Sequence, residues 1–158
     1  MRTVLKITPG TLPAPYARDT WRAMSQENVE LVRRGFDLLN REGLAALDRF
    51  DEIFDPEVEW RAAGRLPDTR RDVRGREALT ALFTEIFTSF DVRVEADEFF
   101  DAGDSVVVVF RQIARGRASG AELTNSFAFL YGFRKGKISC VGGYRTKHEA
   151  LEAVGLRE

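Results

Sequence analysis

Four consecutive strands are predicted in the second half of the chain, between Val92 and Tyr144, after a first half dominated by helical patterns. Residues 92–97 alternate between apolar and charged side chains, which is typical of a strand with one face in water. Residues 106–110 are all apolar, which indicates a strand that is covered on both faces. Short turn sequences such as Lys135-Gly136 join the strands and therefore favour antiparallel pairing. Helices followed by such a sheet predict an α+β fold, with the helices against one sheet face.

Apolar spacing predicts where these helices lie. A first helix is expected from Gln26 to Arg41, with Ser25 as its cap, and a second from Leu44 to Phe54, which Pro56 ends. A third helix begins near Arg76. Its apolar stripe falls at helical spacing on one face and consists of Leu79, Leu82, Phe83, Ile86 and Phe90. We also expect a short strand at residues 58–62 and a closing helix at residues 147–154.

Composition narrows the classes of function. A chain of 158 residues suits one compact domain. Its 24 basic and 25 acidic side chains nearly balance, so we expect no positive electrostatic field that would hold nucleic acid. One cysteine and one histidine exclude multi-thiolate zinc sites and sites with two imidazoles, so we expect no metal and no cofactor. No apolar run approaches the ~20 residues that span a bilayer, so we expect no membrane association and a cytoplasmic location.

The N-terminal stretch differs from the rest of the chain. Residues 1–23 contain three prolines and lack sustained periodicity, so we expect a disordered extension followed by a domain at residues 24–158. Met24 directly precedes the helix cap Ser25. Our hypothesis is that Met24 is the natural start; a real but poorly ordered arm is the alternative.

The order of these elements resembles the nuclear-transport-factor-2-like superfamily, and within it the SnoaL-like proteins, relatives of polyketide cyclases and ketosteroid isomerase. The segments that carry the resemblance span about residues 24–156. They are Met24-Ser25-Gln26-Glu27-Asn28-Val29, Phe54-Asp55-Pro56-Glu57-Val58-Glu59-Trp60, Arg74-Gly75-Arg76-Glu77-Ala78-Leu79, Gly136-Lys137-Ile138 and Glu149-Ala150-Leu151-Glu152-Ala153. The resemblance implies a cone-shaped, curved antiparallel sheet wrapped around helices (a cystatin-like α+β roll), an internal pocket, and a homodimer formed through the outer sheet face.

The resemblance also implies where catalytic groups would stand, and this chain departs from each position. Phe129 occupies the strand position where related enzymes place an acid or a histidine. Gly35 and Phe36 stand where the isomerases carry a tyrosine, and Trp60 stands where they carry a carboxylate base. Limonene-epoxide hydrolases use an Asp–Arg–Asp relay; Arg111 is the one candidate for its arginine, but the following strands lack the aspartates.

Three polar residues remain as weak catalytic candidates: Glu59, Tyr144 and Asn125. A buried Glu59 would have a raised pKa and could act as a base, but alternation opposite Val58 and Trp60 favours a solvent-facing side chain. Tyr144 could donate a hydrogen bond to a ligand carbonyl or simply pack its ring. Arg111 could bind a ligand or form an ion pair with a strand neighbour such as Glu95.

The alternating residues Phe127, Phe129, Tyr131 and Phe133 have two interpretations. They line an apolar pocket if they face the helices, or a dimer surface if they face outward; the pocket is favoured because Asn125 would supply it with one polar group. The pocket predicted in this way consists of Phe36, Trp60, Phe83, Phe87, Arg111, Asn125, Phe127, Phe129 and Tyr144. Three functions stay open: binding a small hydrophobic molecule, cyclase-, isomerase- or hydrolase-type acid–base catalysis, and an interaction domain with a vestigial pocket.

Overall fold

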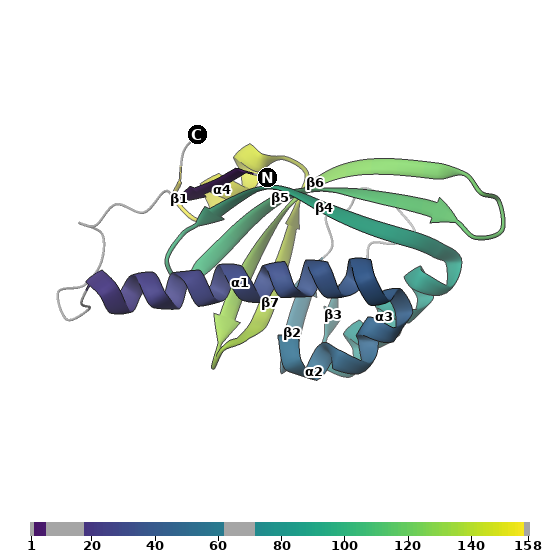
Figure 1. The fold of residues 1–158 in the computed structure, drawn as a ribbon. Coiled ribbons are helices and arrows are strands. Elements are labelled where there is room, and N and C mark those ends of the chain that lie inside the picture. The colour runs from purple at the N-terminus through teal and green to yellow at the C-terminus, as the bar shows by residue number, and fades with distance from the viewer. Residues whose placement is uncertain (1, 6–17, 62–71, 157–158) are drawn as a thin grey trace.

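A single mixed sheet of seven strands forms the frame of the structure, in the order β1-β4-β5-β6-β7-β2-β3 (Figure 1). The computed structural model describes residues 2–5, 18–61 and 72–156. The strands are β1 (Arg2–Leu5), β2 (Phe54–Arg61), β3 (Val73–Arg74), β4 (Phe90–Asp101), β5 (Ser105–Gly116), β6 (Glu122–Arg134) and β7 (Lys137–Tyr144). The four predicted strands are thus confirmed, with β4 to β7 paired antiparallel in chain order. Parallel pairings add β1 beside β4 and β2 beside β7.

The helices are α1 (Arg18–Glu42), the 3-10 helix η2 (Gly43–Arg49), α2 (Phe50–Ile53), α3 (Arg76–Ser89) and α4 (Lys147–Ala153). The predicted start of α3 at Arg76 is confirmed. Three predicted boundaries are wrong: α1 begins at Arg18 rather than Gln26, the second helical segment ends at Ile53 rather than Phe54, and β2 begins at Phe54 rather than at residue 58. Of the predicted extension, residues 6–17 lie outside the described residues, while Arg2–Leu5 form β1.

One turn shows how local sequence sets the strand register beside it. Lys135 and Gly136 connect β6 to β7 with φ angles of 51° and 76°. Two consecutive residues at positive φ match the type I′ hairpin turn, whose twist suits antiparallel strands. This turn aligns Arg134 with Lys137. A register shift between Phe133 and Gly132 then moves the pairing by one residue, so that Gly132 pairs with Cys140 and Ala128 with Tyr144.

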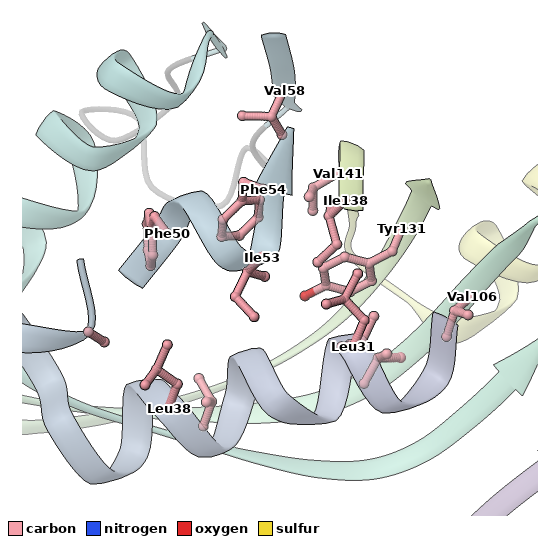
Figure 2. Close-up of a cluster of buried hydrophobic side chains, with 14 of the residues drawn as sticks. Leu31, Leu38, Phe50, Ile53, Phe54, Val58, Val106, Tyr131, Ile138 and Val141 are labelled. Carbon is pink, nitrogen blue, oxygen red and sulfur yellow. The ribbon is translucent and has the colours of Figure 1, made fainter. Parts of the chain in front are cut away.

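The main hydrophobic core lies between the sheet and the helices α1, α2 and α3 (Figures 1 and 2). Figure 2 shows Phe50 and Ile53 of α2 above the side chains of Leu38 and Leu31 of α1, with the hydroxyl of Tyr131 of β6 pointing toward Ile53. Phe50 is 3% exposed, Ile53 2% and Tyr131 5%. Side chains of strands and helices therefore interlock on one face of the sheet.

The opposite sheet face carries a smaller core under α4. It contains Phe100, Val107, Ala128, Ala150 and Leu151, all of them 2% exposed or less. Thr146 caps this helix by accepting a hydrogen bond from the Glu149 N–H at 3.2 Å. We call the face under α1 and α3 the inner face and the face under α4 the outer face. This arrangement confirms the predicted α+β class, although the sheet is mixed at its two flanks.

An ion pair anchors the start of β2 to the end of β6. Arg134 donates to both carboxylate oxygens of Asp55, at 2.8 and 3.3 Å, and the Glu57 N–H donates to the same carboxylate at 2.9 Å. The hydrogen bond from Arg134 and the second one from the Glu57 backbone hold the pKa of Asp55 below its usual range. The anchor holds the start of β2 against the β6–β7 hairpin, and β2 carries Trp60 on its inward-facing side.

Candidate functional site

An aromatic cluster occupies the inner face between α1, α3 and the strands. We define the aromatic cluster as Phe36, Trp60, Phe83, Phe110, Phe127 and Phe129. Trp60 of β2 meets the ring of Phe83 in α3 at 5.2 Å and that of Phe129 in β6 at 5.5 Å, both edge to face. Phe110 of β5 continues the chain of rings, at 4.8 Å from Phe129 and 5.2 Å from Phe36 of α1. Elements distant in sequence therefore build one aromatic surface.

Most of these rings are only partly buried. Phe110 is 4% exposed, whereas Phe36, Trp60, Phe83, Phe127 and Phe129 pack against the core with part of their surface still accessible. Apolar surface that stays accessible on an inward-facing side can gain free energy when a ligand covers it. Of the two interpretations of Phe127, Phe129, Tyr131 and Phe133, the structure supports the inward-facing one.

The structure places the nine predicted pocket residues in four different settings. Phe36, Trp60, Phe83, Phe127 and Phe129 come together in the aromatic cluster. Phe87, which is 4% exposed, stacks behind Phe83 at 5.9 Å. Asn125 shares the face of Phe127 because the two are separated by one residue along β6. The last two predicted residues, Tyr144 and Arg111, lie elsewhere.

Tyr144 does not belong to the inner face, and its placement in the pocket was wrong. It pairs with Ala128 in the β6–β7 register and packs in the outer-face core beside α4. Phe129 pairs instead with Gly143. An offset of one residue along a strand reverses the face of a side chain, so Tyr144 and Phe129 point to opposite sides of the sheet.

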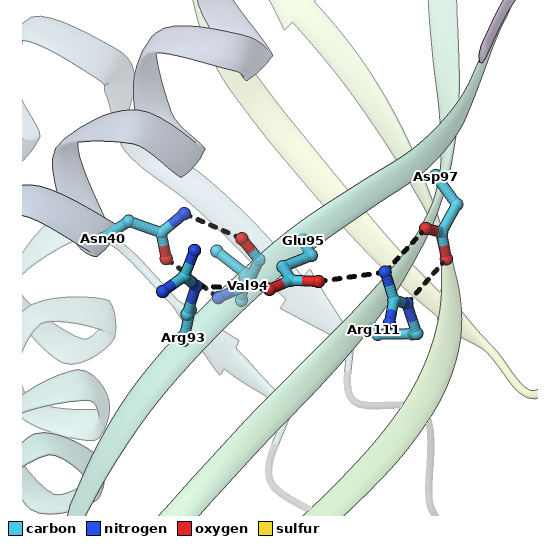
Figure 3. A network of polar contacts seen from close by, with 6 residues as sticks. All are labelled: Asn40, Arg93, Val94, Glu95, Asp97 and Arg111. Carbon is cyan, nitrogen blue, oxygen red and sulfur yellow. Dashed lines mark hydrogen bonds and ion pairs between the residues drawn. The ribbon is translucent and has the colours of Figure 1, made fainter. Parts of the chain in front are cut away.

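The predicted position of Arg111 in the pocket was also wrong, because Arg111 lies on the outer face. Its guanidinium lies 2.9 Å from Glu95 and bonds both oxygens of Asp97 at 3.2 Å (Figure 3). The hydrogen bond and the charge of Asp97, with Glu95, raise the pKa of Arg111. The predicted ion pair between Arg111 and Glu95 is therefore confirmed.

Glu59 is solvent-facing, as strand alternation predicts. Its side chain is 44% exposed and lies 3.6 Å from Arg74, while its neighbour Trp60 points inward. A carboxylate in this position is open to water and paired with an arginine, and it does not face the space beside the aromatic rings. Glu59 therefore does not share a face with the aromatic cluster.

The inner-face strand positions around the aromatic cluster carry no charge. From Val92 to Val94 in β4, Phe110 to Ala114 in β5 and Leu123 to Phe129 in β6, the described inward side chains include no Asp, Glu, His, Lys or Arg. Tyr131 lies further along β6, and burial raises the pKa of its phenol. Within the described residues, no group of three or more His, Cys, Asp or Glu side chains is placed to hold a metal ion. At these strand positions, polar chemistry therefore falls to neutral groups, whereas α1 places the guanidinium of Arg33 over the ring of Phe99 further along the same face.

Gln112 is the inner-face residue that reasoning from the sequence missed. It stands directly opposite Asn125 in the β5–β6 register and two residues from Phe110, so it shares the inner face with both. The signal was present in the sequence, because Phe110 and Gln112 alternate around the outward Arg111. The continuous apolar run at residues 106–110 hid this alternation.

Asn40 of α1 forms one wall of the site. Its amide donates to the Val94 carbonyl at 2.7 Å and accepts from the Val94 N–H at 2.9 Å (Figure 3). These backbone groups lie on the side of β4 away from β5, beyond the stretch of β4 that β1 covers. Asn40 thus replaces a partner strand and fixes the C-terminal end of α1 over the row formed by Val94, Gln112 and Asn125.

A separate shallow depression of about 360 Å³ lies at the first turn of α3. Pro56, Arg76, Glu77 and Thr80 line it. None of these residues belongs to the predicted pocket or to the aromatic cluster, so the depression is distinct from the candidate ligand site on the inner face.

The SnoaL-like domain family matches residues 32–141 of this chain. The chain belongs to this family. The match covers the segment from α1 into β7, which contains every element that contributes to the aromatic cluster. A comparison with curated proteins found no match. Among the residues described, none of the helices is long and apolar enough to cross a membrane.

Solved structures share the fold at low sequence identity. An NTF2-like protein of unknown function from Burkholderia pseudomallei K96243 is 20% identical, with 82% of this chain and 98% of that chain covered and a TM-score of 0.64. A putative SnoaL-like polyketide cyclase from Jannaschia sp. CCS1 is 20% identical, with 84% and 94% covered and a TM-score of 0.64. TerC, co-crystallised with polyporic acid, is 18% identical, with 81% and 98% covered and a TM-score of 0.63. These similarities support the architecture of this SnoaL-like protein.

Proposed function

We propose that this SnoaL-like protein binds a small hydrophobic molecule on its aromatic cluster. The observation that carries the proposal is a set of partly exposed rings, from several elements, on a sheet face without charged strand residues around them. Such a surface offers stacking and edge contacts to a flat apolar ligand, each worth about 0.5–1.5 kcal/mol beyond the area buried. TerC, a structural neighbour that has been co-crystallised with polyporic acid, supports a ligand-binding role for this fold.

Acid–base catalysis of the cyclase, isomerase or hydrolase kind is the alternative. In that enzyme Glu59 would act as the base and Tyr144 or Asn125 would polarise a carbonyl, so Glu59 and one of the other two would have to reach a substrate in the inner-face pocket. Glu59 is solvent-facing beside Arg74, and Tyr144 packs under α4 on the outer face. This version of the enzyme therefore conflicts with the geometry, and ligand binding without proton transfer is the function we favour.

A homodimer through the outer sheet face remains a prediction from the family resemblance. The α4 helix covers the part of that face around Val107 and Ala128. A partner would therefore contact the uncovered part, where Arg111 pairs with Glu95 and Asp97. Light scattering after size exclusion, at low and high salt, tests this: a dimer at both salt concentrations supports the prediction, and a monomer at both contradicts it.

Titration with Nile red, an uncharged dye, tests the binding function. We expect a saturable rise in dye fluorescence, with binding weakened about tenfold by Phe129→Ala, which corresponds to about 1.4 kcal/mol. Phe129→Leu keeps most of the apolar volume and should weaken binding less, and Tyr144→Phe on the outer face should have no effect. Circular dichroism confirms that each variant folds. Absence of saturable binding to the wild-type protein, or equal affinity in both Phe129 variants and the wild type, contradicts the proposal.

A further inference from the structure

We propose that Gln112 and Asn125 form a neutral amide pair that selects an uncharged ligand with a hydrogen-bond acceptor and donor side by side, such as a carboxamide or lactam. The inference rests on the proposed function, because it assigns the polar end of the same site. It names a ligand class, neutral aromatic amides, that a purely apolar surface would not prefer.

The β5–β6 register places the two amides together. Gln112 and Asn125 are direct partners in an unbroken antiparallel ladder that runs from Ser105 to Arg115. Side chains of directly opposed residues have Cβ atoms roughly 4.5–5.5 Å apart. Two carboxamides at this separation can contact the same functional group of one ligand.

The surroundings of the pair are apolar on the inner face. Phe110 and Phe127, also direct partners, stand one row away toward the aromatic cluster. Ala114 and Leu123 form the next row on the other side. Both amides are partly buried. Hydrogen bonds made in such a setting discriminate strongly, because a ligand that lacks the matching group leaves the protein amides unpaired.

The sheet leaves this end of the site open. β7 pairs with β6 only from Ala128 to Arg134, so within the described part of the chain no strand flanks Glu122–Phe127 on that side. Leu123 is accordingly 50% exposed. A ligand can therefore approach the row of Gln112 and Asn125 from the free edge of β6, and its aromatic part can then reach Phe127.

The charge pattern disfavours an ionised ligand here. Arg111, the nearest cation along β5, points outward and is held by Glu95 and Asp97. A carboxylate ligand at the amide pair would lose hydration without meeting a charge of opposite sign on the neighbouring strand rows, Phe110–Phe127 and Ala114–Leu123. A carboxamide of the same shape can donate to one of the two side-chain amides and accept from the other without that cost.

Competition against bound Nile red with three probes of one shape tests the inference: 2-naphthamide, 2-methylnaphthalene and 2-naphthoate. We expect Gln112→Leu and Asn125→Leu each to weaken the binding of 2-naphthamide about tenfold. The affinity for 2-methylnaphthalene should be unchanged or higher in both variants. For the wild type, 2-naphthoate should bind more weakly than 2-naphthamide. Ser126→Ala, one residue along β6 on the outer face, is the matched control and should leave all three affinities unchanged.

The outcomes separate this inference from the proposed function. If 2-naphthamide and 2-methylnaphthalene both displace the dye but neither variant changes their relative affinity, the amide pair plays no part and the hydrophobic site stands. If the wild type binds no Nile red, both proposals fail. Retained 2-methylnaphthalene binding shows that a variant is folded. Asn125→Asp is a further variant that keeps the side-chain volume. At neutral pH it should weaken the binding of 2-naphthamide without changing the affinity for 2-methylnaphthalene.

Discussion

Asn40 offers the sharpest test of how the wall of the site is built. Its side chain makes two hydrogen bonds to the backbone of Val94, at 2.7 and 2.9 Å, on a stretch of β4 that no described strand covers. A hydrogen bond of this kind contributes about 0.5–1.5 kcal/mol net, so Asn40→Ala removes about 1–3 kcal/mol. The lower half of that range is expected, because Asn40 is exposed and water can replace the lost partner.

Urea unfolding followed by circular dichroism at pH 7 measures the loss. With a slope of about 2 kcal/mol per molar urea, a loss of about 1–2 kcal/mol lowers the midpoint by about 0.5–1 M. Asp37→Ala, three residues earlier on α1 and exposed, is the control, because it brings a similar gain in helix propensity without touching β4. A midpoint for Asn40→Ala that is no lower than that for Asp37→Ala would refute the account of this wall.

A second variant at the same position adds a pH signature. Asn40→Asp can still accept from the Val94 N–H, but its other oxygen meets the Val94 carbonyl instead of donating to it. Protonation restores a donor, so folding raises the pKa of the introduced carboxyl. In acid, the variant should therefore lose less free energy of unfolding relative to the wild type. This loss should grow as the pH rises through the raised pKa.

Further predictions concern the ion-pair anchor, the buried phenol and the residues that lie off the inner face. The lowered pKa of Asp55 means that its pairing with Arg134 stabilises the fold above the pKa of the unfolded chain and is lost as the pH falls through the folded value. Urea unfolding at pH 7 and pH 3 should therefore show a smaller loss in the free energy of unfolding for Asp55→Asn at pH 3 than at pH 7; equal losses at both would contradict the ion pair. Burial raises the pKa of Tyr131, so stability is lost above about pH 10, and Tyr131→Phe should resist alkaline unfolding better than wild type in circular dichroism at pH 11. Glu59→Gln and Tyr144→Phe should each leave Nile red affinity within about twofold, and a tenfold loss in either would overturn their placement away from the inner face.

Much of the architecture followed from local patterns in the sequence. The stripe at Leu79, Phe83 and Ile86 predicted α3, and Lys135-Gly136 predicted the β6–β7 turn, because each pattern reports backbone geometry over a few residues. The start of β2 was missed since Phe54 completes an apolar stripe that also suits a helix. Only its parallel pairing with Ile138 of β7 makes this residue part of a strand.

The site was less predictable because it depends on pairing between strands. Alternation correctly placed Trp60 and Glu59 on opposite faces, since both lie in one strand. It could not place Tyr144, because the face of β7 relative to β6 is set by the register that brings Tyr144 opposite Ala128. The amide pair needs the β5–β6 register in the same way, as Gln112 and Asn125 are 13 positions apart in the sequence.

Proton NMR of the protein with bound 2-naphthamide tests the central claim most directly, through nuclear Overhauser contacts between the probe and assigned side chains. The account predicts contacts from the naphthalene protons to the rings of Trp60, Phe127 and Phe129, with shifts in the side-chain amide signals of Gln112 and Asn125. Contacts to Tyr144 or to side chains around Arg111 instead would place the ligand on the outer face and contradict the account.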